Sequence, residues 1–248
     1  MVMAEETKTN TSRKRSVHLF VAKDVARKIL SGKWSVGRII PGEMELCERY
    51  KVSRTALREA IKLLNAKGLL ESRPKIGTRV RAREHWNFLD VQLLEWMNGL
   101  SNATQVYHDF LALRRSIEPE AAILAAQNGT PEQKKQLCET MERMEALVNG
   151  DPSVDWLETD MEFHRQIFLA TGNHFFIPFA NVLRTMFTTF PKHSSNLGNA
   201  NIAFHREVCD AIVEGDVDAA REASIKLLGD SRRHKFEALA NTIQKMLG

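Results

Sequence analysis

Apolar residues recur every three or four positions along most of the 248-residue chain, which is the period of an amphipathic α-helix. From residue 85 onward, no alternating strand pattern competes with this period. The breaks contain glycine or proline, as at Thr130-Pro131, where the threonine suits an N-cap and the proline suits the first helical turn. The helices predicted here cover roughly 89–99, 104–127, 131–148, 153–172, 175–190, 200–214 and 216–244. We therefore expect an all-helical bundle.

The N-terminal part has a different pattern. Residues 1–16 are polar and have almost nothing to bury, so they predict a disordered tail. One helix is predicted to end near Leu30, and residues 43–68 predict two helices joined by a short turn at residues 51–53. Two short strands follow, at about 69–73 and 78–82. This order of elements is that of a winged helix-turn-helix.

The two patterns predict a mainly α fold with two domains. We expect a winged helix-turn-helix with a small β-hairpin over residues 17–83 and an all-helical domain over residues 103–248. Residues 84–102 form the expected linker and linking helix between them. We interpret an aromatic cluster as core of the helical domain and not as a ligand cage: Phe175, Phe176, Phe179, Phe187 and Phe190.

The charge is divided between the same two regions as the predicted domains. The net charge of the chain is +4, but residues 1–83 alone carry +12 and the remainder carries −8. A basic front on an acidic body indicates two domains with different partners. The basic part suits a polyanion such as DNA. A basic surface that merely faces solvent is the alternative, and charge alone does not choose between them.

Two classes of protein are disfavoured by composition. No apolar stretch approaches the ~18 residues that a membrane-spanning helix needs. The polar start lacks the apolar core of a signal peptide. The three cysteines Cys47, Cys138 and Cys209 are odd in number and far apart in sequence, so they indicate neither a disulfide framework nor a cysteine-type zinc site. We expect a cytoplasmic protein with no membrane contact.

The second helix of the helix-turn-helix carries candidate DNA-reading residues. Ser53 is a good N-cap, and the face opposite the apolar stripe presents Arg54, Thr55 and Arg58. Arginine can bind guanine with two hydrogen bonds, and threonine can contact a phosphate or a thymine methyl. Ordinary solvated helix residues are the alternative. The basic excess, the spacing and the basic wing together favour DNA binding.

Residues 39–80 resemble the DNA-binding domain of GntR-type bacterial transcription regulators. The resemblance rests on the nearly continuous stretch IIPGEMELCERYKVSRTALREAIKLLNAKGLLESRPKIGTRV. It implies that the start of the second helix lies at the DNA and that the wing tip reaches the minor groove. Met44 stands where the family often has arginine, which implies a somewhat different operator. The candidate DNA-binding residues are Ser53, Arg54, Thr55, Arg58, Arg73, Lys75 and Gly77.

Residues 103–240 resemble the FCD ligand-binding domain of the FadR subfamily. The matching stretches are LRRSIEPEAAILAA, DMEFHRQIFLATGN and FHREVCDAIVEGDVDAAREA. The resemblance implies a bundle of six or seven helices, a central cavity for a small organic acid, and a homodimer. The segment around residues 85–96 is similar to the same region of galactonate-operon repressors, which favours a sugar acid as effector.

Three residues of the helical domain are candidate metal ligands. Asp160 and His164 are four positions apart and project from one face of one helix, and His205 lies on a later helix. A carboxylate and two imidazoles can form a facial metal site, although a helix-surface pair is the alternative. In metal-binding FCD proteins such residues and one further histidine hold zinc or nickel. Leu227 takes the place of that further histidine, so a three-ligand site, weaker binding and a metal-free cavity all stay open.

Arg114 is the remaining candidate for effector binding, beside Asp160, His164 and His205. It matches an arginine that points into the cavity of many FCD proteins, which implies pairing with a ligand carboxylate. The alternative is a surface ion pair with Glu118, four residues on.

The sequence therefore predicts a homodimeric transcription regulator, and we favour a repressor that a small carboxylate releases from a palindromic operator. We do not expect an enzyme. Two alternatives stay open at this point. One is a metal-dependent enzyme on a helical bundle fused to a DNA-binding domain. The other is a DNA-binding protein that ignores sequence.

Overall fold

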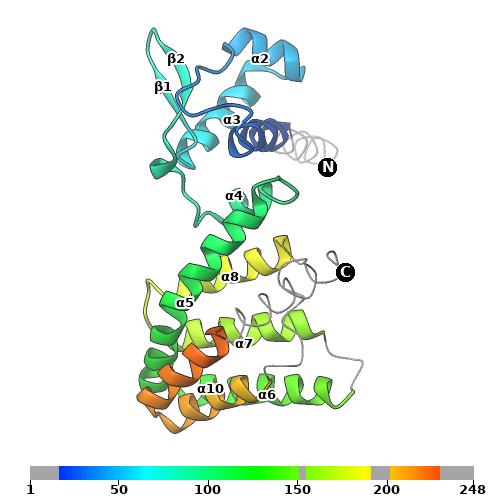
Figure 1. Cartoon of the computed structure of the whole chain (residues 1–248). Coiled ribbons are helices and arrows are strands. Elements are labelled where there is room, and N and C mark those ends of the chain that lie inside the picture. The colour runs from blue at the N-terminus through cyan, green and yellow to red at the C-terminus, as the bar shows by residue number, and fades with distance from the viewer. Residues whose placement is uncertain (1–16, 151–154, 191–201, 230–248) are drawn as a thin grey trace, which may run out of the picture. The chain divides into compact units, whose positions relative to one another are not determined.

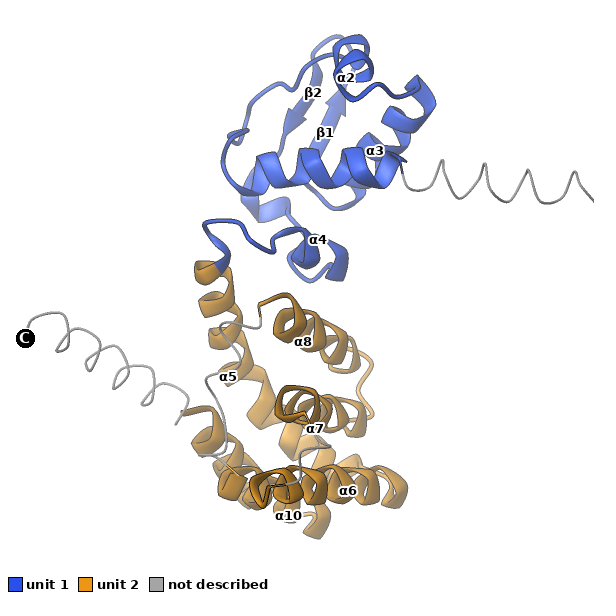
Figure 2. Cartoon of the chain, turned by 90° about the vertical axis from the view of Figure 1, so that its right-hand side faces the viewer, with its two compact units in different colours: residues 1–103 blue, residues 104–248 orange. Residues whose placement is uncertain are grey.

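The computed structural model describes residues 17–150, 155–190 and 202–229. Contacts between Cα atoms divide the chain into two units, residues 1–103 and 104–248 (Figure 2). This division lies one residue from the start expected for the helical domain. The predicted tail over residues 1–16 lies outside the described residues.

The first unit is a winged helix-turn-helix, as the sequence predicts (Figure 1). Its described elements are a helix over residues 17–30, α2 (Glu43–Tyr50), α3 (Arg54–Ala66), β1 (Leu70–Arg73), β2 (Gly77–Val80), η1 (Arg83–His85) and α4 (Val91–Trp96). The first helix turns its apolar face inward and buries Val21, Ala22, Val25, Ala26, Ile29 and Leu30. Burial of this stripe holds the helix on the helix-turn-helix pair.

Local chemistry sets both ends of α3. The Ser53 side chain accepts a hydrogen bond from the Ala56 backbone N–H, which confirms the predicted N-cap. Gly68 follows the helix with a φ of +76°, a conformation that side chains rarely adopt. A Cβ at this position would lie 1.8 Å from the His85 carbonyl oxygen. Only glycine fits where the chain leaves α3 for the wing.

The wing is a short antiparallel hairpin. β1 pairs with β2 in the register Leu70↔Val80 to Arg73↔Gly77. Its second strand begins one residue earlier than predicted and ends two residues earlier, because the 3₁₀ turn η1 follows soon afterwards. The turn between the strands places three residues, 74–76, at the exposed tip.

The expected linker packs as part of the first unit. Arg27 donates hydrogen bonds to the carbonyl oxygens of Trp96 (2.8 Å), the last residue of α4, and of Asn98 (2.7 Å), just beyond it. Lys67, which is buried, pairs with Asp90 at 2.6 Å. These contacts tie α4 to the helices of the first unit, so the linking helix packs as part of that unit.

The second unit is helical throughout its described residues. Its elements are α5 (Ala103–Asn128), α6 (Pro131–Val148), α7 (Trp156–Ala170), α8 (Ile177–Thr189), α10 (Ile202–Glu214) and a helix over residues 217–229. α6 packs against both α7 and α10, and α7 packs against α8. The mainly α fold class is confirmed, and the end of the helix predicted to residue 244 lies outside the described part.

Two sequence interpretations at helix ends have different outcomes. Thr130 and Gln133 form a capping box at the start of α6, which confirms the predicted N-cap. The interpretation of the aromatic cluster as core is confirmed for Phe187 and Phe190, which are buried, and is wrong for Phe175, which is 85% exposed. The Asn173 side-chain oxygen accepts a hydrogen bond from the Phe175 backbone N–H in the turn before α8, and this turn directs Phe175 outward. None of the described helices has the length and apolar character required to cross a membrane.

Candidate functional site

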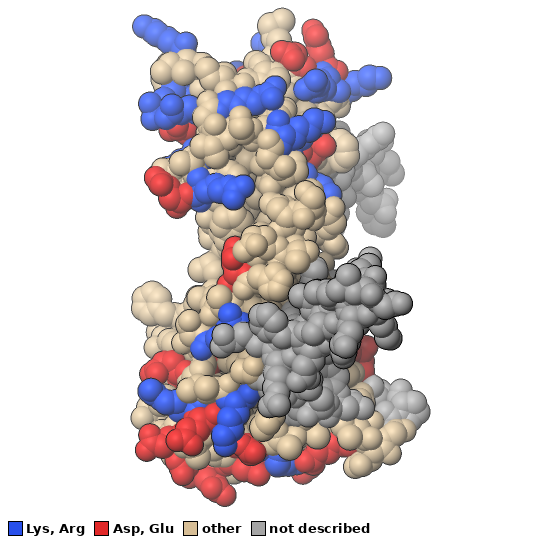
Figure 3. Space-filling model, viewed as in Figure 1, with Lys and Arg blue, Asp and Glu red and all other residues tan. Residues whose placement is uncertain are grey.

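The charge asymmetry of the sequence is visible on the surface of each unit. On the face in Figure 3, Lys and Arg gather over the first unit, whereas Asp and Glu are prominent over the second. The predicted DNA-binding residues are all exposed in the first unit, and the predicted effector and metal residues are all buried in the second. The two sets therefore offer different chemistry and are described in turn.

The start of α3 presents its polar side chains to solvent. Arg54 and Arg58 are both exposed, and Glu43 on α2 faces them. The Arg58 Nε lies 3.0 Å from one Glu43 carboxylate oxygen, and the Arg54 Nε lies 4.0 Å from the other. Sequence reasoning missed Glu43, because its proximity to α3 depends on the angle between the two helices. The Glu43 carboxylate therefore lies beside both guanidinium groups at the start of α3.

The wing tip is the second exposed basic element of this unit. Lys75 and Gly77 both have a left-handed backbone, with φ of +65° and +104°. The Arg73 guanidinium lies 3.3 Å from the Glu71 carboxylate, so this arginine has a neighbour that competes with phosphate. Ile76, between Lys75 and Gly77, is 54% exposed. The tip therefore combines cationic and apolar contact atoms.

The second unit contains a buried cluster of five ionisable side chains. Taken as whole residues, each is at most 5% exposed. α5 contributes the first two members, α7 the next two and α10 the last: Arg114, Glu118, Asp160, His164 and His205. Buried charges are expensive unless they are paired, so the pairing in this cluster determines its cost and its chemistry.

Arg114 and Glu118 form the part of the cluster on α5. The guanidinium donates two hydrogen bonds to the carboxylate, with 3.1 Å between Arg114 Nη2 and Glu118 Oε2. The same Oε2 lies 3.0 Å from His164 Nδ1. The pairing of Arg114 with Glu118 is thus present, but it is buried and not a surface ion pair. The contact between Glu118 and His164 could not be predicted from the sequence, since only the fold brings His164 to Glu118.

Asp160, His164 and His205 bring their ligand atoms together. These atoms all lie within 4.8 Å of one another. His205 Nε2 is 2.9 Å and His164 Nε2 is 3.7 Å from the same Asp160 oxygen. Ligand atoms around a tetrahedral metal, with bonds of about 2.0–2.2 Å, lie about 3.3–3.6 Å apart. The donor set therefore suits a divalent metal ion, and the separations of 2.9 and 3.7 Å lie on either side of this range.

Glu118 determines which nitrogen of the His164 ring carries the hydrogen. A carboxylate can only accept a hydrogen bond, so the Nδ1 facing Glu118 carries the hydrogen. In the neutral imidazole, Nε2 then has its lone pair available on the side of Asp160. A carboxylate behind a ligating histidine is the usual arrangement that orients such a ligand.

Both carboxyl groups in the cluster have lowered pKa values. Burial by itself would raise the pKa of Asp160, but the hydrogen bond from His205 and the nearby positive charges lower it to about 2. Burial opposes ionisation of Glu118 in the same way, and the Arg114 charge with the His164 contacts lowers its pKa to about 2. Both groups are therefore anionic near neutral pH and can bind cations.

Apolar rings surround the charged atoms. The Phe163 ring packs edge-on against His164 and His205, with centroids 5.7 and 5.1 Å apart. Phe187 lies under the Arg114 guanidinium at 4.9 Å. These rings keep water away from the charged atoms and strengthen each electrostatic contact inside. Leu227 is likewise buried in the second unit and offers no ligand atom.

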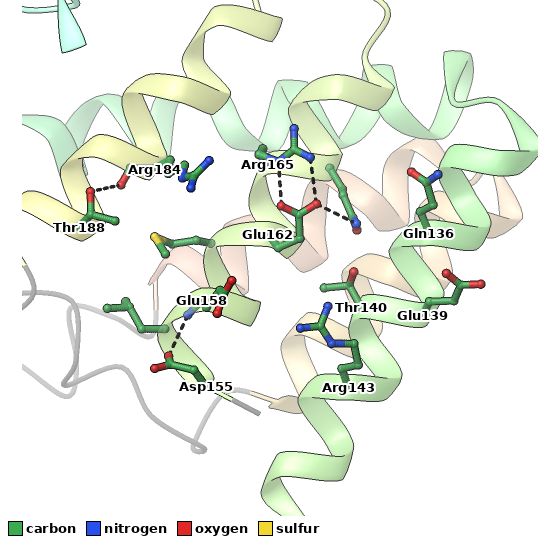
Figure 4. Close-up of a pocket in the computed structure, with 13 residues that line it drawn as sticks. Gln136, Glu139, Thr140, Arg143, Asp155, Glu158, Glu162, Arg165, Arg184 and Thr188 are labelled. Atoms are coloured by element: carbon green, nitrogen blue, oxygen red, sulfur yellow. Dashed lines mark hydrogen bonds and ion pairs between the residues drawn. The ribbon is translucent and has the colours of Figure 1, made fainter. Parts of the chain in front are cut away.

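A second feature is a polar pocket of about 820 Å³ between α6, α7 and α8 (Figure 4). It is lined by the face of α7 opposite Asp160 and His164. Glu162 binds Arg165 through both carboxylate oxygens, at 2.7 and 3.1 Å, and Arg143 and Arg184 extend from the neighbouring helices. The pocket shares no lining residue with the buried cluster.

Comparison with known families covers both units. Residues 18–80 match the family model described as bacterial regulatory proteins, gntR family, and residues 109–230 match the FCD domain. These matches coincide with the two regions that carry the exposed basic residues and the buried cluster.

Two curated relatives and one solved structure extend the comparison. The chain is 40% identical over 214 residues to the uncharacterized HTH-type transcriptional regulator YieP of Escherichia coli, covering 86% of this chain and 93% of the relative. It is 27% identical over 218 residues to the galactonate operon transcriptional repressor of E. coli, covering 86% and 94%. One solved structure is that of Lar, described as controlling the expression of the Listeria monocytogenes agr system. It matches with a TM-score of 0.56 at 15% identity, covering 89% of this chain and 96% of that chain, so the two share a fold.

Proposed function

The chain belongs to the gntR family of bacterial regulatory proteins and carries an FCD domain, and from this premise we propose how its DNA binding is controlled. It is a DNA-binding transcription regulator with an effector-binding domain. Our proposal is that a small carboxylate, held at the buried cluster of the second unit, changes the affinity of the first unit for its operator.

The observation that carries the proposal is the convergence of Asp160, His164 and His205 in a water-excluded site. Their ligand atoms lie within 4.8 Å of one another. A divalent ion such as zinc or nickel would be held by these three side chains, and when bound it would supply Lewis acidity toward an oxygen ligand. Three protein ligands would leave a coordination position for that oxygen, and Leu227, which takes the place of the further histidine of metal-binding FCD proteins, has no atom to fill it.

The charge of the cluster supports an anionic effector. Arg114 is balanced by Glu118, and Asp160 adds one negative charge, while ligating histidines are neutral. A divalent ion therefore leaves one net positive charge, which a single carboxylate neutralises. Because Glu118 already accepts two hydrogen bonds from Arg114, we expect the effector to depend more on the ion than on this arginine.

A sugar acid is the first effector to test. The support is the 27% identity to the galactonate operon transcriptional repressor over most of both chains. We propose repression that the acid relieves, by favouring one placement of the DNA-binding units over another. The absence of enzymatic turnover and a location in the cytoplasm belong to the same proposal, supported by relatives that are transcription regulators.

On the DNA side, we propose a homodimer on a palindromic operator. Each α3 would read one half-site, with half-sites about 34–36 Å apart along the DNA. Arg54, Thr55 and Arg58 would contact bases or phosphates in the major groove. Arg73, Lys75 and Gly77 would place the wing tip at the minor groove. The exposure of all these residues supports the assignment.

The test is an operator selection followed by an effector titration. The full chain selects duplexes from a random library, and fluorescence anisotropy then measures affinity for the selected duplex at fixed salt and zinc. Galactonate, lactate and acetate are titrated in turn. We expect at least one acid to weaken operator binding in the wild type and to have no effect on His164→Ala. The matched control His174→Ala changes an exposed histidine and should respond like the wild type.

Two results would contradict the proposal. Equal affinity for all duplexes at matched salt would leave only phosphate contacts and a protein that ignores sequence. The second is that no acid in a broad panel of carboxylates changes the affinity for the operator. That result would show that carboxylates do not control DNA binding through the second unit.

A further inference from the structure

α6 and α10 bring together two cysteines that lie 71 positions apart in the chain. The Sγ atoms of Cys138 and Cys209 are 4.0 Å apart, and both thiols are free. Cys138 is partly exposed, whereas Cys209 is fully buried. Sequence spacing indicated no disulfide, so the fold creates this proximity. We refer to Cys138 and Cys209 as the thiol pair.

The packing of the two helices fixes the thiol pair in register. On one side of the pair, the Lys134 ammonium on α6 lies 3.4 Å from the Val213 carbonyl oxygen on α10. On the other side, Arg206 of α10 donates a hydrogen bond of 2.8 Å to Glu145 of α6. The helices therefore run antiparallel, and the thiol pair lies between two polar contacts that hold them together. The sulfur contact follows from this register and not from an isolated rotamer.

We propose that the thiol pair is a redox-modification site, at which a peroxide converts Cys138 and Cys209 into an intramolecular disulfide between α6 and α10. The partly exposed Cys138 thiolate attacks one peroxide oxygen, giving a sulfenic acid and releasing hydroxide. The Cys209 sulfur then attacks the sulfenic sulfur, forms the S–S bond and expels the second oxygen. With the two thiol protons, the peroxide leaves as two waters, and two electrons pass from the thiols to the peroxide.

The environments of the two sulfurs support this order of events. Peroxide reaches a partly exposed thiol more readily than a buried one. Burial raises the pKa of the Cys209 thiol to about 12, so Cys209 is almost entirely protonated and reacts second. An S–S bond of about 2.05 Å requires the sulfurs to approach by roughly 2 Å, within reach of side-chain rotation and a small helix shift. A reducing dithiol reverses the reaction.

The disulfide would form one helical turn after a candidate metal ligand. His205 precedes Cys209 by four residues on α10, so both side chains lie along one face of the helix. Oxidation would therefore tie the turn that carries His205 to α6. The thiol pair itself does not depend on the proposed metal site, and its test is carried out without metal.

The experiment counts and maps thiols in the full chain after chelator treatment. The protein is exposed to hydrogen peroxide, the reaction is stopped with catalase, free thiols are alkylated, and peptides are analysed by mass spectrometry. We expect two of the three thiols to be lost, a Cys138–Cys209 linked peptide, and full recovery with dithiothreitol. Cys47→Ser is the matched control and should form the same linked peptide with no thiol left.

Variants of the thiol pair test the assigned order. Cys209→Ser should accumulate a Cys138 sulfenic acid that dimedone traps, whereas Cys138→Ser should leave Cys209 unmodified over the same time. Sulfinic acid at Cys138 with Cys209 still alkylatable in the wild type would overturn the proposal. Disulfides of Cys47 between chains, in place of the linked Cys138–Cys209 peptide, would overturn it equally.

Discussion

The two units place their functional side chains in opposite environments. In the first unit, Arg54 and Arg58 are each about two thirds exposed, with side-chain values of 67%, and their partner Glu43 is on the surface. In the second unit, Arg114 and Glu118 have side chains only 4% and 6% exposed. Each unit contains arginines beside a carboxylate, yet the surrounding medium gives the two arrangements different roles.

This difference determines what a substitution measures. An exposed ion pair contributes little to stability, because water solvates its members equally well when they are apart. Loss of an exposed arginine should therefore weaken partner binding and leave folding intact. A buried pair whose partner is removed leaves an uncompensated charge in a low dielectric. A substitution in the buried cluster should therefore change both the stability of the helical unit and its ligand binding. A substitution of an exposed arginine in the first unit should change partner binding alone.

The largest expected effect is on the buried pair. Arg114→Met keeps much of the side-chain volume but leaves the Glu118 carboxylate without its main counter-charge. We expect the free energy of unfolding to fall by about 3–5 kcal/mol, measured by urea denaturation. The control Arg165→Met removes a half-exposed partner of Glu162 and should cost about 0–1 kcal/mol. Equal losses in the two variants would contradict the contrast between buried and exposed pairs.

Acid should destabilise the second unit more than the first. The pKa values of Glu118 and Asp160 are lowered to about 2 in the folded chain, from 4.5 and 3.8. The unfolded chain therefore binds more protons between those values, so the stabilisation is present above pH 4.5 and is lost as pH falls toward 2. Each carboxylate should account for on the order of 2–3 kcal/mol.

This acid sensitivity is checked by unfolding measurements across pH 2–7. Glu118→Gln removes one of the two titrating groups and should flatten the pH dependence of the unfolding free energy. Glu162→Gln is the control on the outer face of α7, and its pH dependence should follow the wild type. A slope that is identical in all three proteins would place the titrating groups elsewhere.

The next effect is confined to DNA recognition. Arg58→Ala should reduce the discrimination between the selected operator and a mismatched duplex by about 1–3 kcal/mol, if Arg58 reads a base. The unfolding free energy should change by less than about 0.5 kcal/mol. Lys62→Ala removes another exposed cation of α3 and serves as control. Fluorescence anisotropy with both duplexes measures the discrimination. Unchanged discrimination in Arg58→Ala would show that Arg58 reads no base.

The smallest expected effect is at the N-cap of α3. Ser53→Ala removes the acceptor for the Ala56 backbone N–H and should lower the unfolding free energy by about 1 kcal/mol. Affinity should fall for all duplexes alike, because the cap holds the helix and reads no base. A selective loss for one duplex would assign Ser53 a direct role in sequence reading.

The first unit could be predicted almost completely from sequence. Its stripe, N-cap and hairpin are local patterns, so residues close in sequence determine them, and Ser53 shows this directly. The helices of the second unit follow from the same periodicity. Its site could be predicted only in part: Asp160 and His164 share a helix, but the contact of His205 with Asp160 spans 45 residues.

The missed features are those that depend on how helices pack. Glu118 reaches His164, and Cys138 reaches Cys209, only because helices distant in sequence pack side by side. Glu43 lies beside Arg58 for the same reason, at a smaller sequence separation. No periodicity in a single chain specifies the angle or register between two helices. Such contacts therefore required the structure.

The most direct test of the central claim is the metal content of the buried cluster. The full chain is purified without chelator or immobilised nickel, equilibrated with zinc, and its bound metal is counted by native mass spectrometry. We expect one ion per subunit in the wild type and in His174→Ala, none in His164→Ala, and tighter retention in Leu227→His, which supplies a fourth ligand. The absence of bound metal in the wild type, or equal metal content in the wild type and His164→Ala, would contradict the account.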